Sequence, residues 1–133
     1  MKRFSLLTCV LALLTSTLPG CSSNTAKLVP VEGKVLFADG KPLPKGTRLI
    51  FNPNEGKMGS ATAVTDETGS FQAVHQSGSK GAAIGKYSVQ LVSPEGEQKT
   101  FYKAVPSKYY EGTGDLVADV NEGMSPLHFT LKK

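Results

Sequence analysis

Few side chains in this chain of 133 residues have types and spacings that could perform catalysis. The two histidines, His75 and His128, stand at expected strand positions with no HExxH motif, no neighbouring cysteine and no obvious carboxylate partner. A serine, a histidine and an aspartate could be combined on paper, but the sequence has no G-x-S-x-G nucleophile elbow. We therefore expect no metal site, no catalytic residue and no enzyme activity.

The neighbouring carboxylates predict no catalytic site either. Asp66 and Glu67 could ligate Ca²⁺, but this cation takes about six or more oxygens and no loop of the sequence supplies them. An aspartate that opens the Asp-Glu-Thr-Gly tetrapeptide of residues 66–69 is more typical of a turn, where its side chain accepts backbone amides. Asp115 and Asp119 stand four apart on an expected strand, about 13 Å from each other, which is too far for a glycosidase pair.

Cys21 is the one residue whose surroundings predict a chemical modification. A short cationic start precedes an apolar run over residues 4–14, which is the layout of a secretory signal peptide. As a helix that run would rise about 16 Å, well short of the roughly 30 Å hydrocarbon core of a membrane. The following Leu18, Pro19, Gly20 and Cys21 resemble the bacterial lipobox, in which an aliphatic, a middle and a small residue precede the cysteine.

The lipobox resemblance implies a specific processing of this cysteine. Cys21 would receive a diacylglyceryl thioether, become the first mature residue and be N-acylated. Each buried acyl CH₂ contributes about 0.8 kcal/mol, so two long chains would supply on the order of 20 kcal/mol and hold the protein on a membrane. Ser22 resembles the sorting class for the outer membrane, since an aspartate there is the usual signal for retention in the inner membrane. The alternative is an ordinary secreted protein whose cysteine merely lies near the cleavage point.

Cysteine usage and charge exclude other classes of function. Cys9 lies in the leader and Cys21 would be consumed by lipid, which leaves no thiol for a disulfide, a metal or catalysis. The chain has 15 Lys and Arg against 11 Asp and Glu, but Lys2 and Arg3 belong to the leader and no basic block remains. We therefore expect no nucleic-acid partner and no cofactor beyond the covalent lipid.

The segment over residues 99–110 has the character of a binding surface. Its candidate residues are Phe101, Tyr102, Lys103, Lys108, Tyr109 and Tyr110. Aromatic faces beside cations could hold a glycan, an extended peptide or an anionic envelope polymer, although the chain has no Trp, which counts against carbohydrate. The alternative is that about half of these aromatic rings cover the edge of the fold while the lysines keep the surface hydrated.

A period of two predicts the elements that must position these residues. The expected inward rows are Val31, Gly33, Val35 and Phe37; Thr47, Leu49 and Phe51; Phe71, Ala73 and His75; Tyr87, Val89 and Leu91; Leu116, Ala118 and Val120; and Leu127, Phe129 and Leu131. Residues 76–83 have the composition of a mobile Ser/Gly loop, and no stretch after the leader shows a sustained helical repeat. We predict an all-β domain, a seven-stranded antiparallel β-sandwich over residues 31–133, after a leader over 1–20 and a lipidated, flexible tether over 21–30.

Several fragments of these strands and turns follow one another in a familiar order. They are Val31-x-Gly33-x-Val35, Asp39-Gly40-Lys41-Pro42-Leu43-Pro44, Thr65-Asp66-x-x-Gly69-x-Phe71 and Gly85-x-Tyr87-x-Val89. In this order they resemble the carboxypeptidase regulatory-like family, and residues 105–109 resemble a segment of small bacterial envelope lipoproteins that carry such a domain. The resemblance implies a transthyretin-like (prealbumin-like) sandwich that is not itself catalytic.

These patterns together predict a lipid-anchored protein of the cell envelope with a structural or protein-interaction role. Its expected partners are the membrane and an unidentified envelope protein or polymer. The alternative is a module that binds envelope glycan or peptide through residues 99–110.

Overall fold

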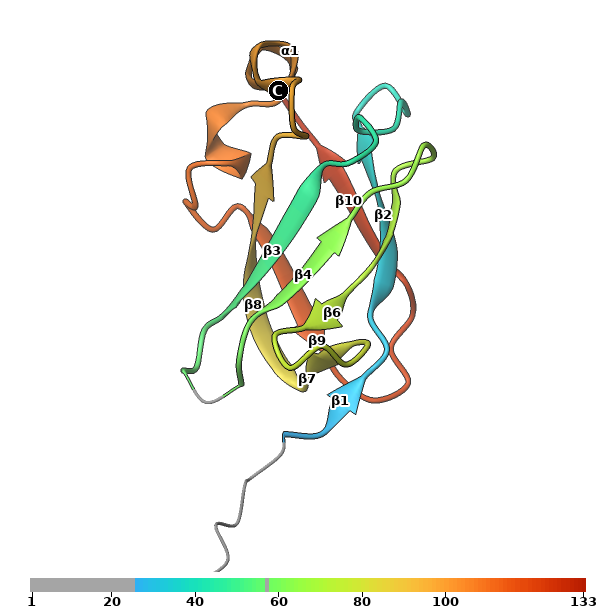
Figure 1. Ribbon diagram of the computed structural model, residues 1–133, viewed down its shortest axis with the longest axis vertical. Coiled ribbons are helices and arrows are strands. Elements are labelled where there is room, and N and C mark those ends of the chain that lie inside the picture. The colour runs from blue at the N-terminus through green and yellow to red at the C-terminus, as the bar shows by residue number, and fades with distance from the viewer. Residues whose placement is uncertain (1–25, 57) are drawn as a thin grey trace, which may run out of the picture.

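The computed structural model describes residues 26–56 and 58–133, which fold mostly into short β-strands (Figure 1). The leader and Cys21 lie outside the described residues. The elements are β1 (Leu28–Val29), β2 (Glu32–Phe37), β3 (Arg48–Pro53), β4 (Ala61–Val64), β5 (Ser70–Gln72), β6 (Val74–His75), β7 (Ala82–Ala83), β8 (Gly85–Val92), α1 (Gln98–Ala104), the 3₁₀ helix η1 (Ser107–Tyr109), β9 (Leu116–Val120) and β10 (Leu127–Leu131). The prediction of an all-β, sandwich-like domain is confirmed at this level.

Two main sheets face each other, with a small third sheet at one end. The larger has the order β6-β4-β3-β8-β9 and is antiparallel throughout; the smaller has the order β10-β2-β5, and β1 pairs with β7. These are ten strands where the sequence predicts seven, and β1, β6 and β7 have two residues each.

The expectation of a purely antiparallel sandwich is wrong at one pair of strands. β10 runs parallel to β2, so that Phe129 stands beside Val35 and Leu131 beside Phe37. Parallel neighbours need a long connection between them. Here almost the whole sequence of the domain separates β2 from β10 along the chain. Periodicity along each strand does not show this direction, because an inward row has the same period whichever way its neighbour runs.

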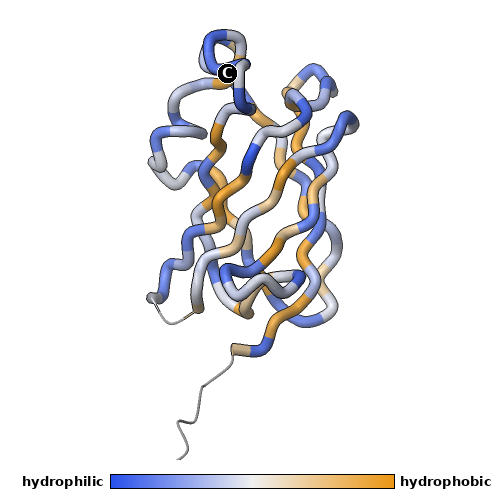
Figure 2. Tube along the Cα trace, in the orientation of Figure 1, coloured by the Kyte–Doolittle hydropathy of each residue, from blue (hydrophilic) through white to orange (hydrophobic). Residues whose placement is uncertain are grey.

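The core lies between the two main sheets and is filled by the predicted inward rows. Figure 2 shows hydrophobic residues gathered on the strands and hydrophilic residues at the turns. Phe51 of β3 contacts Phe71 of β5 across the sheets with ring centroids 6.0 Å apart. Phe71 stacks on Phe129 at 6.1 Å, and Tyr87 meets Phe51 edge-on at 6.3 Å. These contacts confirm a shared interior for most of the predicted inward positions, whereas Gly33, Phe37, His75 and Leu127 are only partly buried.

The domain begins earlier than residue 31. Leu28 and Val29, which the sequence places in the tether, pair as β1 with Ala82 and Ala83 of the expected loop, and Val29 is buried. Gly81 makes this approach possible, since it has a φ of 101° and a Cβ there would overlap the Val29 carbonyl oxygen. The domain therefore starts at β1. The predictions that residues 28–30 belong to a tether and residues 82–83 to a loop are wrong.

The helix α1 is the other element that the strand pattern does not predict. It has seven residues, and Phe101 is the only one of them that is buried. Two turns with one buried side chain are too short to produce a recognisable 3.6-residue repeat. No helix within residues 26–56 and 58–133 combines the length and hydropathy needed to cross a bilayer.

The turn at Asp66 forms as predicted. The Asp66 carboxylate accepts the Thr68 hydroxyl at 2.7 Å, the Thr68 amide at 2.8 Å and the Ser70 amide at 3.0 Å, and Gly69 has a φ of 78°. These bonds, the Thr68 hydroxyl first, hold the pKa of Asp66 below its ordinary value of 3.8. The carboxylate thus acts as a structural acceptor in the turn between β4 and β5.

Replacing this carboxylate should remove part of the acid sensitivity of the fold. A group with a lowered native pKa stabilises the fold above its unfolded pKa, and the stabilisation is lost as pH falls through the native pKa. We expect Asp66→Asn to be less stable than the wild type at neutral pH and the difference to shrink below pH 3.8. Urea unfolding between about pH 6 and pH 2 measures it. Asp119→Asn, at an exposed position of β9, is the matched control, and a stability difference that did not change with pH would contradict the assignment.

Candidate functional site

The structure buries some aromatic residues of the segment predicted as a binding surface and leaves others exposed. Phe101 is fully buried and Tyr109 is only 5% exposed, so both rings belong to the core. Tyr102 is 45% exposed, while Tyr110 is half-buried. Assigning Phe101 and Tyr109 to the surface is therefore wrong, because their rings fill the space beneath α1 and η1. The alternative that about half of the aromatic rings cover the sheets describes these two residues.

The two remaining tyrosines form an edge-to-face pair. The ring centroids of Tyr102 and Tyr110 are 4.7 Å apart, and Phe101 supports Tyr102 from the core side at 5.4 Å. Gln90, on β8, donates from Nε2 to the Tyr110 carbonyl at 2.6 Å, which ties this segment to the sheet. The two lysines of the predicted binding set differ in their surroundings. Lys103 is exposed, whereas the Lys108 ammonium lies 5.0 Å from the centre of the Tyr109 ring.

Tyr102 borders an open hollow of about 550 Å³ on the outer face of the five-stranded sheet, which we call the sheet groove. Its lining residues are Gly46, Arg48, Val64, Val92, Ser93, Glu95, Gln98 and Tyr102. Arg48 stands between Val64 and Val92 in the register of the sheet. Val64 is 56% exposed, so the groove presents an apolar strip beside a cation and a phenol ring.

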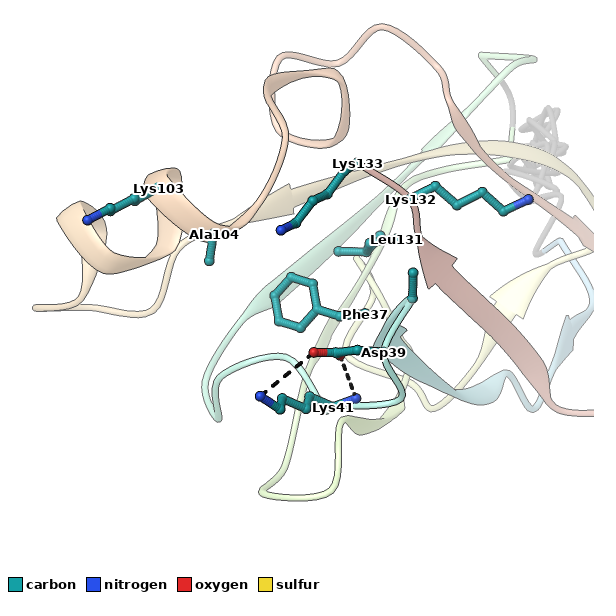
Figure 3. Close-up of a pocket in the computed structure, with 9 residues that line it drawn as sticks. Phe37, Asp39, Lys41, Lys103, Ala104, Leu131, Lys132 and Lys133 are labelled. Carbon is teal, nitrogen blue, oxygen red and sulfur yellow. Dashed lines mark hydrogen bonds and ion pairs between the residues drawn. The ribbon is translucent and has the colours of Figure 1, made fainter.

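A second hollow, which we call the end pocket, lies between α1, the turn after β2 and the C-terminal residues (Figure 3). It has a volume of about 500 Å³. Its lining residues are Phe37, Ala38, Asp39, Lys41, Lys103, Ala104, Leu131, Lys132 and Lys133. Four of these residues are apolar, four are lysines, and one is an aspartate.

Backbone hydrogen bonds hold the walls of the end pocket in place. The Ala38 amide donates to the Leu131 carbonyl at 3.0 Å, which joins the turn after β2 to the end of β10. Asp39 Oδ1 accepts the Lys41 amide at 3.0 Å inside that turn. The Tyr109 hydroxyl accepts the Lys132 amide at 2.9 Å and donates to the Lys132 carbonyl at 3.1 Å. The buried tyrosine of η1 therefore positions the C-terminal wall.

Of the predicted binding residues, only Lys103 lines the end pocket, and most of the pocket is not foreseen from the sequence. Phe37 and Leu131 are recognisable as members of inward rows, and Lys132 and Lys133 as a short cationic end. The missing information is the parallel pairing of β2 with β10, which sets Phe37 beside Leu131. A search for apolar residues next to unpaired lysines at strand ends would have singled out these positions.

The histidines take structural or exposed positions. His75 Nδ1 accepts the Ser77 amide at 3.2 Å, and Nε2 lies 3.0 Å from the Met58 carbonyl, so the ring ties two loops together. His128 is exposed on β10. Across residues 26–56 and 58–133, no three histidine, cysteine, aspartate or glutamate side chains gather as metal ligands would.

Comparison with known proteins identifies no relative of the chain. No protein family matches it, and neither does any curated protein or solved structure. The lipobox residues Leu18, Pro19, Gly20 and Cys21 lie outside the described residues, so the lipidation of Cys21 stays a prediction.

Removing the Tyr109 hydroxyl should loosen the C-terminal wall. We expect Tyr109→Phe to lower the free energy of unfolding by about 1–2 kcal/mol, because the amide and carbonyl of Lys132 lose their partner while the ring stays packed. Tyr102→Phe is the matched control, since its hydroxyl has no hydrogen bond within the described residues and its loss should change stability little. Chemical denaturation compares the two variants, and equal effects would contradict the role of the Tyr109 hydroxyl.

Proposed function

We propose that this chain is an exported protein held on the cell envelope by lipid on Cys21, with a structural or protein-interaction role and no catalysis of its own. The lipobox of residues 18–21 after a short apolar leader is the observation that carries this proposal. The diacylglyceryl and N-acyl chains would together exceed the single chain that gives only marginal attachment.

The arrangement of the domain supports an anchor at one end and contacts at the other. β1, from which the chain leads back toward Cys21, lies at one end of the long axis, while α1 and the C-terminus lie at the opposite end (Figure 1). Because the body starts at β1, the tether is reduced to residues 22–27 and would average about 12–15 Å. An anchored domain would thus sit close to the membrane with α1 directed away from it, toward an envelope protein or polymer. Ser22 after the cysteine favours the outer membrane.

The finer fold assignment is part of the same proposal. We assign the domain to a transthyretin-like sandwich of the carboxypeptidase regulatory-like family, whose seven strands would be β2, β3, β4, β5, β8, β9 and β10, with the two-residue strands β1, β6 and β7 as additions. Two facing main sheets support it, as does the turn at Asp66 within one of the quoted fragments. The inward direction of Val35, Phe71 and Tyr87 in the other fragments agrees with such a core.

The sheet groove favours a second candidate function, the binding of envelope glycan or an extended peptide. Tyr102 and Val64 are both about half exposed beside it, at 45% and 56%, and Arg48 supplies a cation. A phenol ring and an apolar strip could stack against a sugar face or a peptide side chain. This binding would use Tyr102 and Tyr110 rather than the buried members of the predicted set.

The anchor is tested by changing the cysteine that would carry it. We expect the wild-type chain from a bacterial host to enter the detergent phase and to show the added mass of the lipid, whereas Cys21→Ser should stay in the aqueous phase or keep its leader. Phase partitioning with intact mass measures both properties. Cys9→Ser is the matched control, because Cys9 is discarded with the leader and its replacement should leave lipidation unchanged. A wild-type protein with a bare thiol at Cys21 would overturn the proposal.

The second candidate is tested at the exposed tyrosine. We expect Tyr102→Ala to weaken retention on purified peptidoglycan or on an envelope peptide array about twofold to tenfold, the range expected for one aromatic contact. Val117→Ala, which truncates another exposed side chain on β9, should bind as the wild type does. Equal retention of all three proteins would dismiss the sheet groove as a binding site.

A further inference from the structure

We propose that the end pocket binds a small organic anion, a carboxylate or sulfonate attached to an apolar body the size of one or two aromatic rings. This inference goes beyond the proposed function, and it does not depend on the lipid of Cys21. It rests on three properties of the pocket: its size and apolar wall, its unpaired cations, and the bonds that hold its shape.

The pocket has the size and lining of a ligand site. Its volume of about 500 Å³ falls within the range of roughly 300–1,000 Å³ that small-molecule sites occupy. Phe37 of β2 and Ala104 of α1 supply accessible apolar surface, and the buried Leu131 of β10 packs behind them. Figure 3 shows the Phe37 ring beneath the opening, with Leu131 beside it. An apolar ring of a ligand could lie against this wall and exclude water.

The charge at the opening selects an anion. The one acidic side chain of the lining, Asp39, is already paired with Lys41, whose Nζ lies 3.8 Å from Asp39 Oδ2. Lys103, Lys132 and Lys133 have no ion pair within residues 26–56 and 58–133. The lining thus has four lysines against one aspartate, and this excess of positive charge favours an anion.

One of the lysines is placed to contact the ligand directly. In Figure 3 the Lys133 side chain extends into the space between Ala104 and the Phe37 ring, while Lys103 and Lys132 point outward. Lys133 would therefore pair with the carboxylate or sulfonate, and the other two cations would attract the anion over a longer range.

The pocket is formed before any ligand arrives. The bonds from Ala38 to Leu131 and from Tyr109 to Lys132 fix two of its walls, and Leu131 is itself only 2% exposed. A site whose walls are already ordered loses little conformational entropy on binding. The end pocket also lies at the end of the molecule opposite β1, so it is open to soluble ligands even when the chain is anchored.

Calorimetric titration of the full chain in a neutral detergent, with the detergent alone as the reference, tests the proposal whether or not Cys21 carries lipid. The probes are 2-naphthoate, the neutral 2-naphthamide and inorganic phosphate. We expect saturable binding of 2-naphthoate, much weaker binding of the amide, which lacks the charge, and of phosphate, which lacks the apolar body, and a loss of affinity as salt is added. Amide or phosphate binding as tight as that of naphthoate would overturn the assigned ligand class.

Two matched lysine variants locate the binding. Lys133→Gln should weaken 2-naphthoate binding about threefold to tenfold, the effect of losing one partly exposed ion pair. Lys86→Gln, an exposed lysine near the start of β8 and outside the pocket lining, should leave the affinity unchanged. Equal affinities for the wild type and both variants would overturn the assignment of the end pocket. Phe37→Leu should also weaken naphthoate, and an unchanged affinity would overturn the role of the apolar wall.

Discussion

The contact between Phe51 and Phe71 joins the two main sheets, and the rest of the structure depends on it. Phe51 and its neighbour Tyr87 come from the five-stranded sheet, whereas Phe71 and Phe129 come from the three-stranded one. Each such aromatic pair adds about 0.5–1.5 kcal/mol to the burial of its surface. With no disulfide available to the domain, this buried row is what keeps the sheets in a single orientation.

The parallel pairing of β2 and β10 brings together two walls of the end pocket. Phe129 must face Phe71 in the core, which fixes the register of β10 against β2 and brings Leu131 level with Phe37. A shift of one residue would turn every side chain of β10 to the opposite face. The end pocket thus exists because the core determines where β10 ends, and because Tyr109 then holds the residues that follow it.

The two ends of the domain are suited to different tasks. The chain enters the domain at β1, which pairs with β7. The proposed lipid anchor would therefore lie near this end of the domain. The opposite end carries the end pocket and lies beside the sheet groove, so both hollows would face away from the membrane.

The sequence by itself determined the strand rows, since the facing of Tyr87, Val89 and Leu91 depends only on the alternation of a strand. It likewise determined the turn at Asp66, whose hydrogen bonds reach no further than Ser70. The predicted lipobox of residues 18–21 also rests on the sequence alone, because such a motif is defined by a linear segment. The tertiary structure decided the burial of Phe101, the pairing of β1 and the assembly of the end pocket. Each of these depends on which distant segments meet, and neither composition nor periodicity carries that information.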